Sequence, residues 1–234
     1  MMVNRAPNFL DLDATTTESH VNDVAIWIQY KLRLSQELER RQEQVKIQLY
    51  YECLCPDCRV FDTSSLAPTV EKLANYLDLQ LYPYGNAKTT IHQDGRVEIN
   101  CQHGPAECYG NMLHACAIDK LNNVTKATLF NSCMMEHWQK NKGSDDEAAD
   151  KCGSRMQIDT SSIKSCAKGP EGMQLLKHYG EESKKVTYLG VPYILINGVE
   201  NSGDNFFRDV CDAFRNPPQE CNEIYKMYNN IIFG

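Results

Sequence analysis

The segment Cys55-Pro56-Asp57-Cys58 stands where one hydrophobic periodicity gives way to another, and this junction restricts the possible folds more than any other feature. Residues 45–51 alternate in the manner of a β-strand. The residues after Cys58 place apolar side chains at helical spacing, with Pro68 expected to kink the helix. Pro56 suits the first helical position, where a missing N–H costs nothing. The pattern therefore predicts a strand, a C-x-x-C segment and a helix in immediate succession.

This location gives the two cysteines a chemical meaning that the C-x-x-C string alone lacks, because eleven cysteines in 234 residues produce such strings by chance. Near the N-cap, Cys55 faces unpaired backbone N–H groups and the positive end of the helix dipole, which lower the pKa of a thiol. We expect Cys55, at the exposed helix end, to attack a disulfide and Cys58 to resolve the mixed disulfide. The negative charge of the Asp57 carboxylate is expected to oppose this lowering of the Cys55 pKa.

The remaining pattern predicts further strands and helices in a recognisable order. Strands are expected at 79–84, 97–99 and within 188–199, where Asn197-Gly198 forms a turn. Helices are expected between about 105 and 180, including 124–141 and 169–179, and at 204–215. This order joins a βαβ half to a ββα half and predicts an α/β, thioredoxin-like fold with a disulfide-rich helical insertion at about 103–180. In that architecture, Val191-Pro192 is expected to form a cis-proline loop that faces the C-x-x-C and binds substrate.

The N-terminal region differs in composition from the rest. Residues 1–20 resemble a flexible leader, and 21–44 predict one helix with a very polar end, so we place the domain at 45–221, with a leader and polar helix at 1–44 and a tail at 222–234. No apolar core of a secretory signal is visible near the start. We expect that the natural chain starts elsewhere or that the sequence was trimmed or fused; the alternative is a protein that is not secreted.

Charge and cysteine usage limit the classes of function. A net charge of −7 argues against nucleic-acid partners, and no segment is apolar enough to span a membrane. Many irregularly spaced cysteines favour structural disulfides in an oxidising compartment. Asn123-Val124-Thr125 is a sequon that predicts glycosylation at Asn123.

A second motif carries a specific resemblance. Cys101-Gln102-His103-Gly104-Pro105-Ala106-Glu107-Cys108, followed by Asn111 and Cys116, resembles the signature of the gamma-interferon-inducible lysosomal thiol reductase family. The resemblance covers roughly residues 45–221. It implies a reductase of protein disulfides, with unfolded or disulfide-bonded proteins as substrates, in lysosomes or endosomes or secreted. It places the redox pair on Cys55 and Cys58. The block itself, with residues Cys101, Gln102, His103, Gly104, Glu107 and Cys108, is diagnostic.

Counting the cysteines leaves one unexplained. Cys53 stands where the family has a small residue, and it is expected to be either a free thiol or a competitor for Cys55. Eight others are expected in structural disulfides, with Cys211 and Cys221 paired across the tail and the other six open to 15 connectivities. These eight are Cys101, Cys108, Cys116, Cys133, Cys152, Cys166, Cys211 and Cys221.

Three alternatives remain open at this point. Zinc could be held by His103 with Cys101 and Cys108, or by Cys53, Cys55 and Cys58, although we expect no metal and expect His103 to orient the insertion by hydrogen bonding. The enzyme could be a disulfide oxidase or isomerase, since sequence does not give a reduction potential. A non-catalytic secreted binding protein could keep the scaffold. The favoured interpretation is a thiol–disulfide reductase with no bound cofactor, which needs an external thiol such as glutathione or cysteine.

Overall fold

The computed structural model describes residues 26–34, 44–137 and 143–222, and the chain divides into two units, 1–42 and 43–234. In the first unit, residues 26–34 are helical, as expected, and the rest of the predicted leader and helix lies outside the described residues. The predicted helix 124–141 extends into residues 138–142, and the predicted tail is described only at residue 222. These two expectations therefore also lie partly outside the described residues. None of the described helices has the length and apolar character to cross a membrane.

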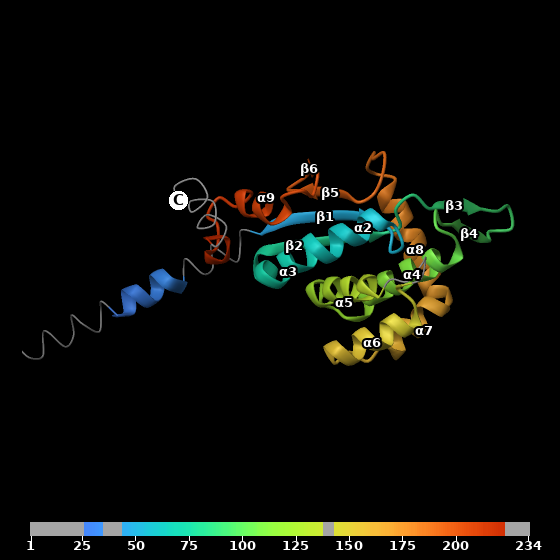
Figure 1. Cartoon of the computed structure of the whole chain (residues 1–234), viewed down its shortest axis with the longest axis horizontal. Helices are drawn as coiled ribbons and strands as arrows, with labels where there is room; N and C mark the ends of the chain where they lie inside the picture. Colours follow the sequence, from blue (N-terminus) through green and yellow to red (C-terminus); the bar gives the residue numbers. More distant parts are fainter. Residues whose placement is uncertain (1–25, 35–43, 138–142, 223–234) are drawn as a thin grey trace, which may run out of the picture. The chain divides into compact units, whose positions relative to one another are not determined.

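The second unit is built on a mixed four-stranded sheet with the order β2-β1-β5-β6 (Figure 1). Strand β1 (Val45–Tyr51) pairs in parallel with β2 (Leu77–Pro83) and antiparallel with β5 (Tyr193–Ile196), which pairs antiparallel with β6 (Val199–Asn201). The parallel pair is the βαβ half, and β5, β6 and α9 (Phe206–Asp212) are the ββα half. The thioredoxin-like α/β fold predicted from the element order is therefore confirmed.

The helical crossover between β1 and β2 is interrupted near Pro68, as the sequence predicted. Helix α2 (Pro56–Phe61) runs into a π-helical turn at Asp62–Leu66, and α3 (Ala67–Leu73) then begins with Pro68 in its first turn. A ring that cannot donate an N–H is accommodated where the helical hydrogen bonding already changes. The apolar face of this crossover packs on the sheet, with Leu66, Val70 and Leu73 almost fully buried.

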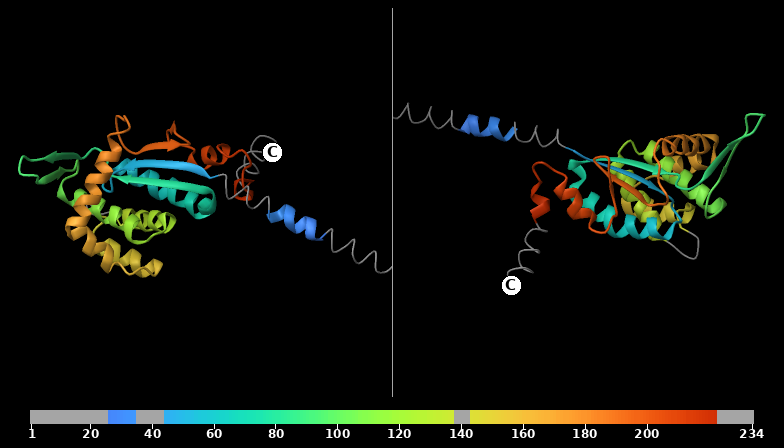
Figure 2. Two further views of the ribbon diagram at one scale, coloured as in Figure 1. Left: turned by 180° about the vertical axis from the view of Figure 1, so that it is seen from behind. Right: turned by 90° about the horizontal axis from the view of Figure 1, so that it is seen from above.

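Five helices make up the insertion between the two halves. They are α4 (Pro105–Lys120), α5 (Val124–Glu136), α6 (Asp146–Met156), α7 (Ser161–Lys168) and α8 (Pro170–Ser183). Figure 1 shows α4 to α7 below the sheet and α8 running down beside the end of the sheet, and Figure 2 shows these helices from behind and from above. Two disulfides, Cys116–Cys166 and Cys133–Cys152, lie inside their apolar core. Strands β3 (Lys88–Ile91) and β4 (Val97–Asn100) form a separate hairpin at the end of the sheet; β3 was not predicted.

Candidate active site

Cys55 occupies the N-cap of α2, between the end of β1 and the start of the crossover helix. Its backbone is extended (φ −63°, ψ 123°), its carbonyl accepts from the N–H of Arg59 at 3.1 Å, and its Sγ accepts from the N–H of Cys58 at 3.5 Å. Pro56 fills the first helical position, where no N–H is needed. The local sequence therefore produces the N-cap geometry that was expected, with the sulfur at the positive end of the helix.

The two thiols of the pair differ sharply in acidity. The hydrogen bond from the Cys58 thiol, helped by the backbone N–H groups of Cys58 and Asp57, lowers the pKa of Cys55 from 9.0 to about 6. Burial and the Asp57 carboxylate oppose this lowering. Burial raises the pKa of Cys58 far above its ordinary value, and donating to Cys55 adds to the effect. At neutral pH the pair therefore holds one thiolate, on Cys55, and one thiol, on Cys58.

Access to this sulfur is narrower than expected for an exposed helix end. The Cys55 residue is 8% exposed, compared with 1% for Cys58, while the neighbouring Pro56 and Asp57 are exposed. The loop before β5 limits the opening, since the carbonyl oxygen of Val191 lies 3.6 Å from the Cys55 Sγ. The Val191–Pro192 peptide bond is cis. The structure thus places the two predicted substrate-loop residues beside the predicted nucleophile.

The signature block forms a turn that enters α4. A disulfide joins Cys101 to Cys108, and Gly104 at the N-cap has a φ of +84°, a conformation that glycine adopts without strain. The backbone N–H of His103 donates to Glu107 Oε1 at 2.9 Å, and His103 Nδ1 lies 2.5 Å from Glu107 Oε2. Gln102 accepts from the side chain of Asn86 at 2.7 Å. His103 therefore orients this turn by hydrogen bonds, in the way the sequence suggested.

Glu52 is a site residue that the sequence analysis missed. It follows β1, precedes Cys55 by three residues and is completely buried. Its Oε1 accepts from the N–H of Asn86 at 2.5 Å, and its Oε2 lies 3.5 Å from His103 Nδ1. Burial raises its pKa to about 7, and the charges of Glu107 and of Cys55 add to the shift. An acidic residue directly after a buried strand, beside a C-x-x-C, was the signal that could have identified it.

Comparison with known proteins decides the family. Residues 46–156 match the family model described as gamma interferon inducible lysosomal thiol reductase (GILT). GILT-like protein 2 of Drosophila melanogaster is 37% identical over 162 residues, which cover 68% of this chain and 72% of the relative. A gamma-interferon-inducible lysosomal thiol reductase-like protein of Anopheles gambiae is 36% identical, covering 78% of this chain and 82% of the relative. The chain belongs to the GILT family.

Solved structures show the same fold at low sequence identity. MdbA, a thiol-disulfide oxidoreductase from Corynebacterium diphtheriae, superposes with a TM-score of 0.51 at 14% identity, covering 74% of this chain and 85% of that one. The reduced form of DsbG from Mycobacterium tuberculosis gives the same TM-score and identity, covering 76% and 82%. These similarities agree with the thioredoxin-like arrangement of this GILT chain.

Cys53 is enclosed and does not compete for the active-site sulfur in the structure. It is fully buried, its Sγ lies 3.6 Å from the carbonyl oxygen of Glu107, and burial raises its pKa well above the ordinary value. A Cβ on Gly110 would lie 2.4 Å from this sulfur, so the helix fits closely against it. Its backbone N–H donates to Asn111. Of the two expectations for Cys53, the structure shows the free thiol.

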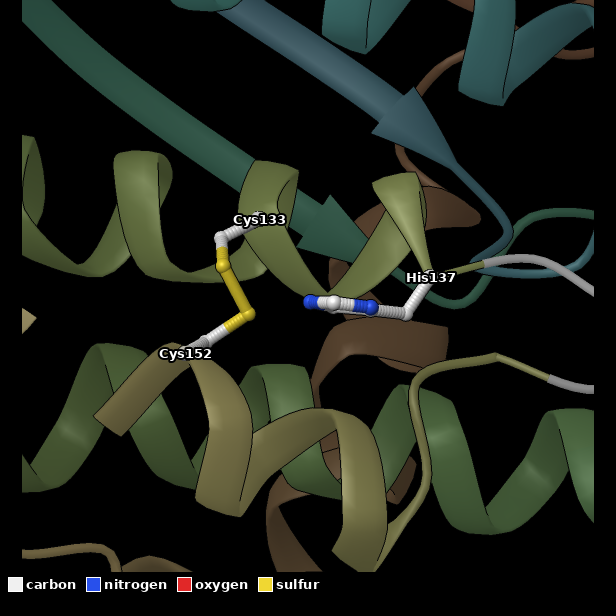
Figure 3. Close-up of side chains that lie close together, drawn as sticks. All are labelled: Cys133, His137 and Cys152. Carbon is white, nitrogen blue, oxygen red and sulfur yellow. A yellow bond between two sulfur atoms is a disulfide. The ribbon is translucent and has the colours of Figure 1, made fainter. Parts of the chain in front are cut away.

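The structure pairs all eight cysteines that were expected in structural disulfides. The pairs are Cys101–Cys108, Cys116–Cys166, Cys133–Cys152 and Cys211–Cys221. The Cys101–Cys108 bond removes the thiolates that a zinc site with His103 would need. Figure 3 shows His137 beside the Cys133–Cys152 bond, and there too both sulfurs are already bonded to each other. The Glu52–His103–Glu107 cluster brings two buried carboxyl groups to one imidazole, and His103 Nδ1 shares a short hydrogen bond with Glu107.

Asn123 lies at the surface of the insertion. It is exposed and caps α5, its Oδ1 accepting from the N–H of Lys126 at 2.9 Å. The capping hydrogen bond uses the amide oxygen and not the amide nitrogen, which is the atom that carries an N-linked glycan.

Proposed function

We propose that this GILT family member reduces disulfide bonds of protein substrates, with Cys55 as the nucleophile and Cys58 as the resolving cysteine. The observation that carries the proposal is the pair of unequal thiols at a helix N-terminus. One is ionised near neutral pH and lies against a cis-proline loop, and the other is buried and protonated. A reductase needs this asymmetry, because the attacking sulfur must be a thiolate while the resolving sulfur waits.

The reaction proceeds by two exchanges. The Cys55 thiolate attacks one sulfur of the substrate disulfide, forming a mixed disulfide and expelling the other sulfur as a thiolate that takes a proton from solvent. Cys58 then loses its proton and attacks the Cys55 sulfur, which forms the Cys55–Cys58 disulfide and releases the second substrate thiol. Val191 and Pro192 offer backbone groups to the substrate beside Cys55. An external thiol, glutathione or cysteine, returns the pair to the dithiol form without a bound cofactor.

Unfolded or disulfide-bonded proteins suit the geometry as substrates. Since Cys55 is only 8% exposed, a disulfide must be presented on a chain that can reach past the Val191–Pro192 loop. A flexible or unfolded segment can do this more easily than a disulfide inside a packed domain. We further propose that the protein works in an endosomal or lysosomal compartment or is secreted, with a glycan on Asn123, and fluorescence microscopy with glycosidase treatment tests both points.

Reduction of insulin and of denatured immunoglobulin by the full chain tests the mechanism. Cys55→Ser should abolish turnover, whereas Cys58→Ser should trap the mixed disulfide that mass spectrometry detects. Cys53→Ser is the matched control, because its thiol is buried and protonated; it should retain most of the activity. Equal activity of the wild type and Cys55→Ser would reject the mechanism. The equilibrium of the pair with glutathione distinguishes a reductase from an oxidase or isomerase.

A further inference from the structure

Exposed apolar side chains are few in the second unit, and two of them belong to the segments that meet at Cys55. Among the described residues of this unit, four large apolar residues are exposed. They are Val60 at 66%, Ile91 at 61%, Leu189 at 105% and Val199 at 70%. Single exposed apolar side chains are ordinary at a protein surface. What distinguishes Val60 and Leu189 is their position, in the helix that begins at Cys55 and in the loop that faces it.

The outward face of α2 presents Val60 one turn beyond Pro56. Residues four apart in an α-helix lie on the same face, and Pro56 and Val60 are both exposed, whereas Cys58 is buried. Pro56 directly follows the nucleophile. At a rise of about 1.5 Å per residue, Val60 lies only about 7 Å along the helix from Cys55. A polypeptide bonded to the Cys55 sulfur can therefore run along this face and reach Val60.

Leu189 lies in a loop that is fixed on both sides of it. Before it, the hydroxyl of Tyr188 donates to the carbonyl oxygen of Gly85 at 2.9 Å. After it, the carbonyl oxygen of Val191 lies 3.6 Å from the Cys55 Sγ. The Cα atoms of Leu189 and Val191 are at most about 7 Å apart, since only two residues separate them. Figure 1 shows this loop, between α8 and β5, projecting above the sheet, and the Leu189 side chain is fully exposed on it.

The reaction itself determines what covers these two side chains. The sulfur that Cys55 attacks belongs to a cysteine of the substrate, so the residues next to that cysteine must pass over α2 and the facing loop. Burying apolar surface is favourable, and it is largest when the arriving side chains are apolar as well. Large apolar residues are mostly buried in folded proteins and become accessible when a protein unfolds. The occupant with matching chemistry is therefore an unfolded segment with apolar residues around its cysteine.

We propose that Val60 and Leu189 bind the apolar side chains that flank the substrate cysteine, so that disulfides in apolar sequence are reduced in preference to those in polar sequence. This inference rests on the proposed function and names the disulfides that it favours. The exchange chemistry is unchanged, because the two side chains contact only the neighbours of the reacting sulfur. They give the site a preference for unfolded substrates that is separate from the limited access to Cys55.

Reduction of two matched peptides by the full chain tests the proposal. Each peptide is a disulfide-linked dimer with one cysteine per chain, and the two differ only in having Leu or Ser on both sides of that cysteine. Glutathione is the reductant, and the uncatalysed exchange is subtracted. For the wild type we expect kcat/KM to be about three to ten times higher for the Leu peptide. In Val60→Ser and in Leu189→Ser this ratio should fall toward one.

Val199→Ser is the matched control. Val199 is as exposed as Val60, but it pairs with Ile196, at the end of β5 away from the Val191–Pro192 loop. The ratio for this variant should equal that of the wild type. A wild-type ratio near one would overturn the proposal, and so would a ratio that Val60→Ser and Leu189→Ser leave unchanged.

A competition experiment leaves Val60 and Leu189 in place and so does not depend on how those variants fold. Cys58→Ser is offered an equal mixture of the two peptides, and mass spectrometry counts the mixed disulfides formed on Cys55 at short times. The Leu peptide should predominate, and equal amounts would reject the preference. Failure of the proposed function has a different sign, namely peptide reduction that survives Cys55→Ser, so the two hypotheses can be rejected separately.

Discussion

The hydroxyl of Tyr51 and Nδ1 of His114 lie 3.0 Å apart in the interior and join the end of β1 to the middle of α4. The other ring nitrogen of His114 lies 2.9 Å from the Ser144 hydroxyl. Both Tyr51 and His114 are buried, at 1% and 0% exposure. This contact ties the sheet to the helical insertion directly behind the active-site segment.

The burial of His114 predicts a loss of stability in acid. Burial lowers its pKa from 6.5 to about 3, so below pH 6.5 the unfolded chain binds a proton that the folded chain does not. Stability from this residue is complete above pH 6.5 and falls as the pH drops, by on the order of 3 kcal/mol at pH 4.5. Urea unfolding at pH 7 and 4.5 should show this difference between wild type and His114→Gln. His178→Gln, at an exposed histidine of α8, is the control and should parallel the wild type.

Asp57 tunes the nucleophile and offers a test of the electrostatics at the helix N-terminus. Its carboxylate raises the pKa of Cys55 against the hydrogen bonds that lower it. Asp57→Asn should therefore move the midpoint of Cys55 alkylation by iodoacetamide from about pH 6 to a lower value, by roughly half a pH unit. Asp94→Asn, in the exposed turn of the β3–β4 hairpin, should leave the midpoint in place. An upward shift in Asp57→Asn would contradict the assignment of charges.

The order of elements was predictable because it depends on local periodicity. Alternation at 45–51, helical spacing after Cys58 and the Asn197-Gly198 turn are local patterns, and the structure has β1, α2 and a turn with positive φ at both of these residues. Strand β3, at Lys88–Ile91, was missed, because it is an exposed hairpin strand without a buried face. Strand β3 is defined by its antiparallel pairing with β4, and its residues lack the apolar alternation by which a strand is detected in a sequence.

The site was only partly predictable because some of its members meet through the tertiary fold. The N-cap position of Cys55 follows from its neighbours, and the Val191–Pro192 loop follows from the element order. Glu52 and His103 are 51 positions apart, and only the packing of α4 against the end of β1 brings them together. The disulfide pairing of the insertion has the same origin, since Cys116 and Cys166 face each other across α4 and α7.

The burial of Asp62 predicts a pH dependence of folding stability opposite to that predicted for His114. It lies in the π-helical turn, is 2% exposed, and burial raises its pKa to about 7. Between pH 4 and 7 the unfolded chain has ionised this carboxyl while the folded chain keeps its proton, so stability falls as the pH rises through that range. Asp62→Asn should remove this dependence, so its free energy of unfolding relative to wild type should increase by on the order of 4 kcal/mol as the pH rises from 4 to 7. Denaturant unfolding across that range measures it, and parallel curves for the two proteins would contradict it.

The close approach of Gly85 to Glu52 gives the last prediction. Gly85 has a φ of +58°, and a Cβ placed there would lie 2.2 Å from Cγ of Glu52. Gly85→Ala therefore combines backbone strain with a collision against a buried side chain that the backbone N–H of Asn86 holds by a hydrogen bond. Gly198→Ala is the matched control, because Gly198 has a φ of +81° but open space around its Cβ position.

We expect Gly198→Ala to lower the free energy of unfolding by about 1 kcal/mol, from backbone strain alone. We expect Gly85→Ala to lower it by roughly 2–4 kcal/mol. Thermal unfolding of the two variants at one pH measures the difference. Equal losses of stability in the two variants would show that Glu52 moves aside freely, and would mean that its carboxyl is not held in place beside the redox pair.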